Sequence, residues 1–186
     1  LSISNIFFLP FDRLFISIIL KIFSVETSFT CGRTDEYRLI IFSAITLHHK
    51  IMYSFSELPT NALTSLRRSL ISHVKRYSSA SKVVQENLCM ALAQLAVQDE
   101  SWTNVLSTLV PMFDQTSMGS LLRIMKLIPE ECRSRRCTAS RSAQGAMMQE
   151  LNRSSGDVIK LLADCMRRVH SSDVRMIRCV FECLSN

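Results

Sequence analysis

The sequence predicts an all-α protein, an α-solenoid of HEAT-type helix pairs that repeat about every forty residues. The chain has only 4 glycines and 4 prolines among 186 residues, which is few for an all-β protein with a turn roughly every ten residues. Its hydrophobic content of 47% is enough for a core and excludes a wholly disordered chain. From residue 61 onward, apolar residues recur with the spacing of amphipathic helices. The first helices of successive pairs are expected to begin near residues 61, 101 and 141.

The first pair is expected to begin with a helix over residues 61–77, capped by Thr60 or Asn61. A second helix follows the segment "SSAS" and carries a broad apolar face as far as Ala96. In the second pair, one helix follows Ser101 and places Trp102 on its apolar stripe, so that Trp102 is expected to be buried between helix pairs.

The fourth helix is expected to start near Thr116 and to end at Pro129, because proline cannot extend the helical hydrogen-bond ladder. Glu130 and Glu131 then mark the exit into a loop. Adjacent carboxylates point in different directions on a helix or an extended chain, so they do not form an acid–base pair for catalysis.

The third pair is expected to hold a less regular helix over about residues 143–169 and a last helix over residues 174–184. Helix pairs of this kind bury their apolar faces against their neighbours and present an extended surface to partners. An unrelated helical bundle is the alternative to the solenoid.

Residues 1–50 differ in composition from the rest, and we expect them to form an unassigned apolar extension that can be deleted without unfolding the helical array. Seven of the ten phenylalanines lie in this part. The segment 6–23 is apolar enough to suggest a membrane span, but Asp12, Arg13 and Lys21 interrupt it. Because the chain begins with Leu1 and not with methionine, we also expect it to be incomplete at its start.

Composition and motifs argue against an enzyme. The net charge is +6 without a block of like charges, so direct nucleic-acid binding is not expected. The seven cysteines lack tight C-x-x-C spacing and are expected to be free thiols that hold no metal. There is no Gly-rich phosphate loop, and the four histidines accompany no local nucleophile arrangement, so neither cofactor nor catalytic residue is predicted.

The segment "RSRRCTASRSAQ" supports one alternative function. Its arginines (Arg133, Arg135, Arg136, Arg141) alternate with serines (Ser134, Ser140, Ser142), a pattern typical of RNA binding or phosphorylation. It contains no aromatic residue on which a base could stack. The alternatives are therefore an Arg-Ser-loop RNA-binding helical module and a helical protein anchored in a membrane by residues 6–23.

Two stretches resemble the importin-β superfamily of nuclear transport receptors. They are "KIMYSFSELPT" and "SLRRSLISHVKRYSSASKVVQENLCMALAQLAVQDESW", and "LLRIMKLIPEE" follows them. Within the superfamily, the nearest group is importin-13 with its sister group transportin-SR. The resemblance covers residues 51–186, is strong through residue 131, and does not extend into residues 1–50.

The resemblance implies stacked HEAT repeats that bind the GTPase Ran in its GTP form, protein cargo and nucleoporins, in a receptor that moves between nucleus and cytoplasm. It also implies a fragment, because the first helices of such receptors, which contribute much of the Ran contact, are not recognisable here. Polar residues on the second helix of each pair are the candidate partner-binding residues: Lys82, Glu86, Arg123, Lys126, Arg175, Arg178 and Glu182.

Overall fold

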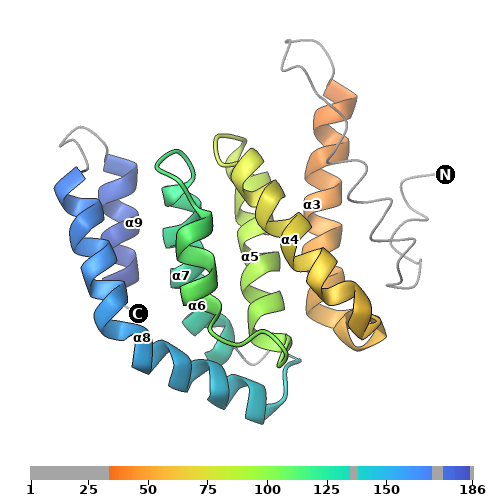
Figure 1. Ribbon diagram of the computed structural model, residues 1–186. Helices are drawn as coiled ribbons and strands as arrows, with labels where there is room; N and C mark the ends of the chain where they lie inside the picture. The colour runs from red at the N-terminus through yellow and green to blue at the C-terminus, as the bar shows by residue number, and fades with distance from the viewer. Residues whose placement is uncertain (1–33, 135–137, 169–173, 185–186) are drawn as a thin grey trace. The chain divides into compact units, whose positions relative to one another are not determined.

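The computed structural model describes residues 34–134, 138–168 and 174–184, and all regular structure within these ranges is helical (Figure 1). This confirms the predicted all-α class. The chain divides into two compact units, residues 1–95 and 96–186, which are described separately below.

The described part of the first unit consists mainly of three long helices. They are α3 (Thr34–Ser54), α4 (Thr60–Arg76) and α5 (Lys82–Gln98), and the one-turn 3-10 helix η1 (Phe55–Glu57) follows α3. The last residues of α5, from Ala96 onward, belong to the second unit. The sequence predicted α4 and α5 closely, because both carry apolar residues at helical spacing.

Helix α3 was not predicted, and it changes the interpretation of residues 1–50. Ile40, Ala44, Leu47 and Ile51 recur at helical spacing along α3 and are at most 4% exposed. The predicted boundary at residue 50 therefore falls inside a buried helix and not between elements. Apolar residues lie on most sides of this segment ("RLIIFSAITL"), which hides the amphipathic period. Residues 1–33 lie outside the described residues.

Hydrogen bonds from the first N–H groups of α4 and α5 show where each helix begins. Thr60 is the first residue of α4 and not its cap, and the residue before it, Pro59, accepts a hydrogen bond from the Ala62 N–H at 2.8 Å. At the start of α5, the Ser81 hydroxyl oxygen accepts a bond from the Val84 N–H at 3.5 Å. Ser81 thus caps α5, as the "SSAS" segment suggested.

The second unit contains one short helix and three longer ones. They are α6 (Val105–Leu109), α7 (Met118–Arg133), α8 (Arg141–Arg168) and α9 (Val174–Leu184), with the 3-10 helix η2 (Val110–Met112) after α6. Helix α7 contacts both α8 and α9, and α8 contacts α9. The first helices of the three pairs start at residues 60, 105 and 141, spacings of 45 and 36 residues on either side of the predicted forty.

The third predicted helix is shorter in the structure. Asn104 has a left-handed backbone with φ of 54°, so the helix cannot begin at Ser101. Pro111 lies in the 3-10 turn after α6, where its missing N–H ends the α-helical ladder. Trp102 therefore precedes the helix, yet it is only 6% exposed, which confirms its predicted burial.

Helix α7 continues through Pro129 to Arg133, so the predicted end at Pro129 is wrong. The proline removes one bond from the ladder, the one to the carbonyl of Met125 four residues earlier, and the helix continues past it. Pro129 itself is buried. Glu130 and Glu131 belong to the last turn and not to a loop.

Helix α8 is the longest element, with 28 residues, and it bends partway along its length (Figure 1). The stretch Ser154–Gly156 lies at its middle, and the Ser155 hydroxyl donates a hydrogen bond to the Asn152 carbonyl at 2.9 Å. Serine–glycine sequences are a common cause of helix kinks.

The first prediction concerns α3. Replacing Leu47 by alanine should lower the free energy of unfolding by about 3 kcal/mol, because a fully buried leucine leaves a cavity. Replacing Tyr37, which is 40% exposed on the same helix, should cost much less. Urea denaturation followed by circular dichroism compares the two. Equal losses would show that α3 is not part of the core.

Two buried histidines make the first unit sensitive to acid. His73 of α4 is 7% exposed, and burial, aided by the Arg76 charge, lowers its pKa to about 4. The His48 Nδ1 of α3 lies 3.3 Å from the Asn87 Oδ1 of α5, and since an amide oxygen only accepts, this nitrogen donates the hydrogen bond. Burial lowers the pKa of His48 as well.

The second prediction follows from the sign of these shifts. Between pH 6.5 and pH 4, His73 takes up a proton in the unfolded chain but stays neutral in the folded one, so stability is lost as the pH falls. From pH 7 to pH 5, His73 alone should remove about 2 kcal/mol of unfolding free energy. His73→Leu should reduce the pH dependence by that amount, whereas Thr64→Ala, at an exposed uncharged residue of the same helix, should leave it unchanged. Urea midpoints at the two pH values provide the measurement.

Candidate functional site

Charged side chains from α7 and α9 meet on the surface of the second unit. The Lys126 Nζ of α7 lies 3.0 Å from the Glu182 Oε2 of α9 and 4.0 Å from the Glu130 Oε1 one turn along α7. These three side chains are between about a third and two fifths exposed. The packing of α7 on α9 brings Lys126 and Glu182 together although 56 residues separate them.

Lys126 and Glu182 each stabilise the charged form of the other. The hydrogen bond to Glu182 raises the pKa of Lys126, and the same bond lowers the pKa of Glu182. The Arg178 and Arg123 charges lower the pKa of Glu182 further. We call Arg123, Lys126, Glu130, Arg178 and Glu182 the α7–α9 charge cluster. It holds three basic and two acidic residues, so it retains an excess of one positive charge.

The structure therefore brings together four of the seven residues predicted from the sequence. Lys82 and Glu86 form their own ion pair of 3.7 Å within the first unit, one turn apart on α5, with side chains 80% and 40% exposed. Arg175 belongs to α9, but its side chain lies outside the described residues.

Cysteines beside the cluster have a packing role. The Cys183 Sγ donates a hydrogen bond to the Leu122 carbonyl at 2.9 Å, which adds a second link between α9 and α7. Burial raises the pKa of Cys183 to about 12, so the thiol stays protonated and unreactive. Within residues 34–134, 138–168 and 174–184, no three His, Cys, Asp or Glu side chains gather closely enough to hold a metal ion.

The segment considered for RNA binding includes the end of α7, the start of α8 and the residues that connect them. Arg133 ends α7 and Arg141 begins α8. Ser140 accepts a bond from the Ala143 N–H at 3.0 Å, which caps α8, and donates to the Glu100 Oε1 at 2.7 Å. Arg135 and Arg136 lie outside the described residues. Ser140 is thus a structural cap.

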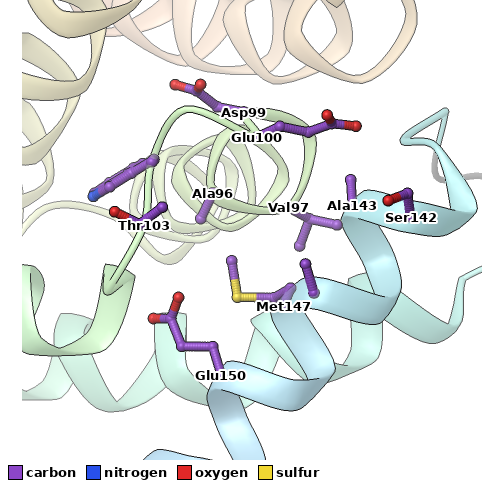
Figure 2. A pocket seen from close by; sticks show the side chains of 11 residues that line it. Ala96, Val97, Asp99, Glu100, Thr103, Ser142, Ala143, Met147 and Glu150 are labelled. Carbon is purple, nitrogen blue, oxygen red and sulfur yellow. The ribbon is translucent and has the colours of Figure 1, made fainter.

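An open pocket of about 230 Å³ lies elsewhere in the second unit, and sequence reasoning missed it. Figure 2 shows Ala96 and Val97 at the end of α5 opposite Met147 and Glu150 of α8. The Glu150 Oε1 accepts a bond of 3.3 Å from the Leu106 N–H at the start of α6. No local sequence pattern could predict this pocket, because the residues of its two walls are about 50 positions apart in the chain.

The membrane interpretation rested on residues 6–23, which lie outside the described residues. In the part of the chain that the structure describes, every helix is too short or too polar to cross a membrane.

The arrangement defines a class of protein: an all-α protein built of consecutive helices, with charged side chains on the surface of its second unit and no metal-binding cluster among the described residues. Comparison with known proteins then gives the family. The exportin 1-like protein family matches residues 81–186, and the chain belongs to this family. The match includes the whole α7–α9 charge cluster.

Individual relatives agree with the family. The chain is 31% identical to importin-13 of Mus musculus over 140 residues, which cover 70% of this chain and 14% of importin-13. It is 28% identical over 137 residues to the mRNA transport regulator MTR10 of Saccharomyces cerevisiae, covering 73% of the chain and 14% of MTR10. It is 26% identical over 141 residues to transportin MOS14 of Arabidopsis thaliana, covering 72% of the chain and 15% of that protein.

The chain is thus a homologue of importin-13 and MTR10 in the karyopherin-β family of nuclear transport receptors, as the sequence resemblance indicated. It spans about 14% of the length of these relatives. The family consists of transport receptors and not of enzymes, which confirms the prediction that the chain is not an enzyme.

The third prediction tests the strength of the cluster. In a double-mutant cycle, Lys126→Met and Glu182→Gln should show a coupling of about 0.5 kcal/mol in the free energy of unfolding, because partly exposed ion pairs contribute little. The coupling should fall further in 1 M salt. The pair Lys160–Asp157 on α8, whose side chains are 79% and 84% exposed, should couple more weakly. A coupling at Lys126 no larger than at Lys160 would contradict the analysis.

Proposed function

We propose that this chain binds Ran in its GTP form through the α7–α9 charge cluster, as part of a receptor that carries protein cargo between cytoplasm and nucleus. The observation that carries the proposal is the family match over residues 81–186, which contains this cluster. The relatives are an importin, a transportin and an mRNA transport regulator, and their names support a role in transport.

The charge of the cluster supports an acidic partner surface. Arg123, Lys126 and Arg178 come from two helices that pack directly on each other, so their relative positions are fixed by the core. Glu182 and Glu130 hold Lys126 in place without neutralising the two arginines completely. A protein surface with carboxylates at matching spacing meets three basic side chains at once.

Binding by this chain is expected to be the sum of several weak contacts. A single exposed ion pair contributes only about 0.2 to 1 kcal/mol, so no one substitution should abolish Ran binding. Since the chain spans 14% of its relatives' length, it is expected to contribute to the Ran interface and not to suffice for tight binding. Cargo and nucleoporins are further proposed partners, to which we assign no residues.

The fourth prediction uses a chimera, in which the matching segment of mouse importin-13 is replaced by the matching residues of this chain. The chimera should bind Ran-GTP more tightly than Ran-GDP. Reversing Arg123, Lys126 and Arg178 together to glutamate should weaken Ran-GTP binding by at least about tenfold, because three contacts of roughly half a kcal/mol each are lost and like charges are brought together in their place. Isothermal titration calorimetry measures both affinities.

The matched control reverses three exposed basic residues of α8, Arg153, Lys160 and Arg168, to glutamate. It makes the same change in net charge at a different place, so it should weaken binding by threefold or less. Equal affinity of the unmodified chimera for both nucleotide states would refute the Ran proposal. Equal losses in the two triple variants would show that net charge, and not the cluster, is responsible.

A further inference from the structure

The pocket between the end of α5 and the start of α8 is a second candidate for binding. Its walls come from the last turn of α5 (Ala96, Val97), from the connection between α5 and α6 (Asp99, Glu100, Trp102, Thr103) and from the first three turns of α8 (Ser142, Ala143, Ala146, Met147, Glu150). All of these residues belong to the second unit.

The size of the pocket indicates a single side chain. Pockets for small-molecule ligands typically have about 300 to 1,000 Å³, whereas this one has about 230 Å³. Its inner surface is apolar, since Val97, Ala143 and Met147 are between 2% and 6% exposed. An aliphatic chain fits such a floor, and Trp102 adds an aromatic wall.

Carboxylates give the pocket its polarity. Figure 2 shows Glu150 at one edge of the pocket and Glu100 at another. Each accepts a hydrogen bond on one oxygen from a neutral donor, the Leu106 N–H and the Ser140 hydroxyl respectively. No lysine, arginine or histidine is found among the described residues that line the pocket, although the whole chain carries a net charge of +6.

A pocket with an apolar floor and carboxylates at its edge complements a long basic side chain, which has an apolar stem and a charged end. Lysine and arginine bury their methylene stems against apolar surface while the charged group stays at a polar edge. The cationic group then meets Glu150 and, at longer range, Glu100, and it gains from the nearby indole ring. A neutral or acidic side chain lacks these interactions.

We propose that this pocket binds one arginine or lysine side chain from a partner polypeptide, with Glu150 as the direct ionic contact and Val97 and Met147 beneath the aliphatic stem. This site is separate from the α7–α9 charge cluster, and the proposal does not depend on Ran binding.

The test uses the chain with a blocked heptapeptide of glycine and serine that carries one central arginine. Trp102 is the only tryptophan, so its indole N–H signal in a nitrogen-15 NMR spectrum reports on the pocket alone. The arginine peptide should shift this signal in a saturable way, and added salt should weaken the binding. The same peptide with citrulline, which keeps the shape but lacks the charge, should bind at least fivefold more weakly.

Two amide variants locate the contact. Glu150→Gln should weaken binding of the arginine peptide by about fivefold, and Glu100→Gln by about twofold. Glutamine still offers an oxygen to Leu106 or Ser140, so both variants should keep the fold, which thermal unfolding verifies. Asp157→Asn, on the exposed side of α8, is the matched control and should leave the affinity for the arginine peptide unchanged.

Three outcomes would overturn the proposal. The first is equal binding of the arginine and citrulline peptides. The second is unchanged affinity in Glu150→Gln. The third is a Trp102 signal that moves with the concentration of the protein itself, since the occupant would then be a second copy of the chain.

Discussion

The structure depends on the burial of α5, whose second half has no side that water can reach. Nine consecutive residues, from Ala91 to Asp99, are buried, and Leu92 and Leu95 are fully covered. A helix that is apolar on all sides is stable only inside a protein, because each face must be covered by another element. The buried run therefore requires other elements around it, so α5 is not a single amphipathic helix lying on a surface.

The charges of the α7–α9 charge cluster take their positions from the packing of the second unit. The α7–α9 charge cluster exists because α7 packs on α9, and the Cys183–Leu122 bond fixes the same contact on the buried side. Exposed ion pairs are weak, so the cluster contributes little to stability.

The two candidate surfaces of the second unit have opposite polarity. The α7–α9 charge cluster carries an excess of positive charge, whereas the pocket beside α8 is lined with carboxylates and no described basic residue. Helix α8 links the two surfaces, since its first three turns line the pocket and the helix packs against α7 and α9, which carry the cluster. Its bend lies near Ser154–Gly156, at the middle of the helix (Figure 1). Surfaces of opposite charge suit a protein with more than one partner, which agrees with the proposed role in transport.

The sequence by itself determined the helical class and the approximate positions of α4, α5, α7 and α9, because these follow from spacing within one helix. It also indicated the burial of Trp102, although this residue precedes the helix on which it was expected. Only the tertiary structure decided the rest. Helix α3 has apolar residues on most sides, so its place in the core depends on what covers it. The passage of α7 through Pro129 depends on local packing. The Lys126–Glu182 contact and the pocket between Val97 and Met147 each join residues about 50 positions apart, and chain spacing contains no information on which helices will pack together.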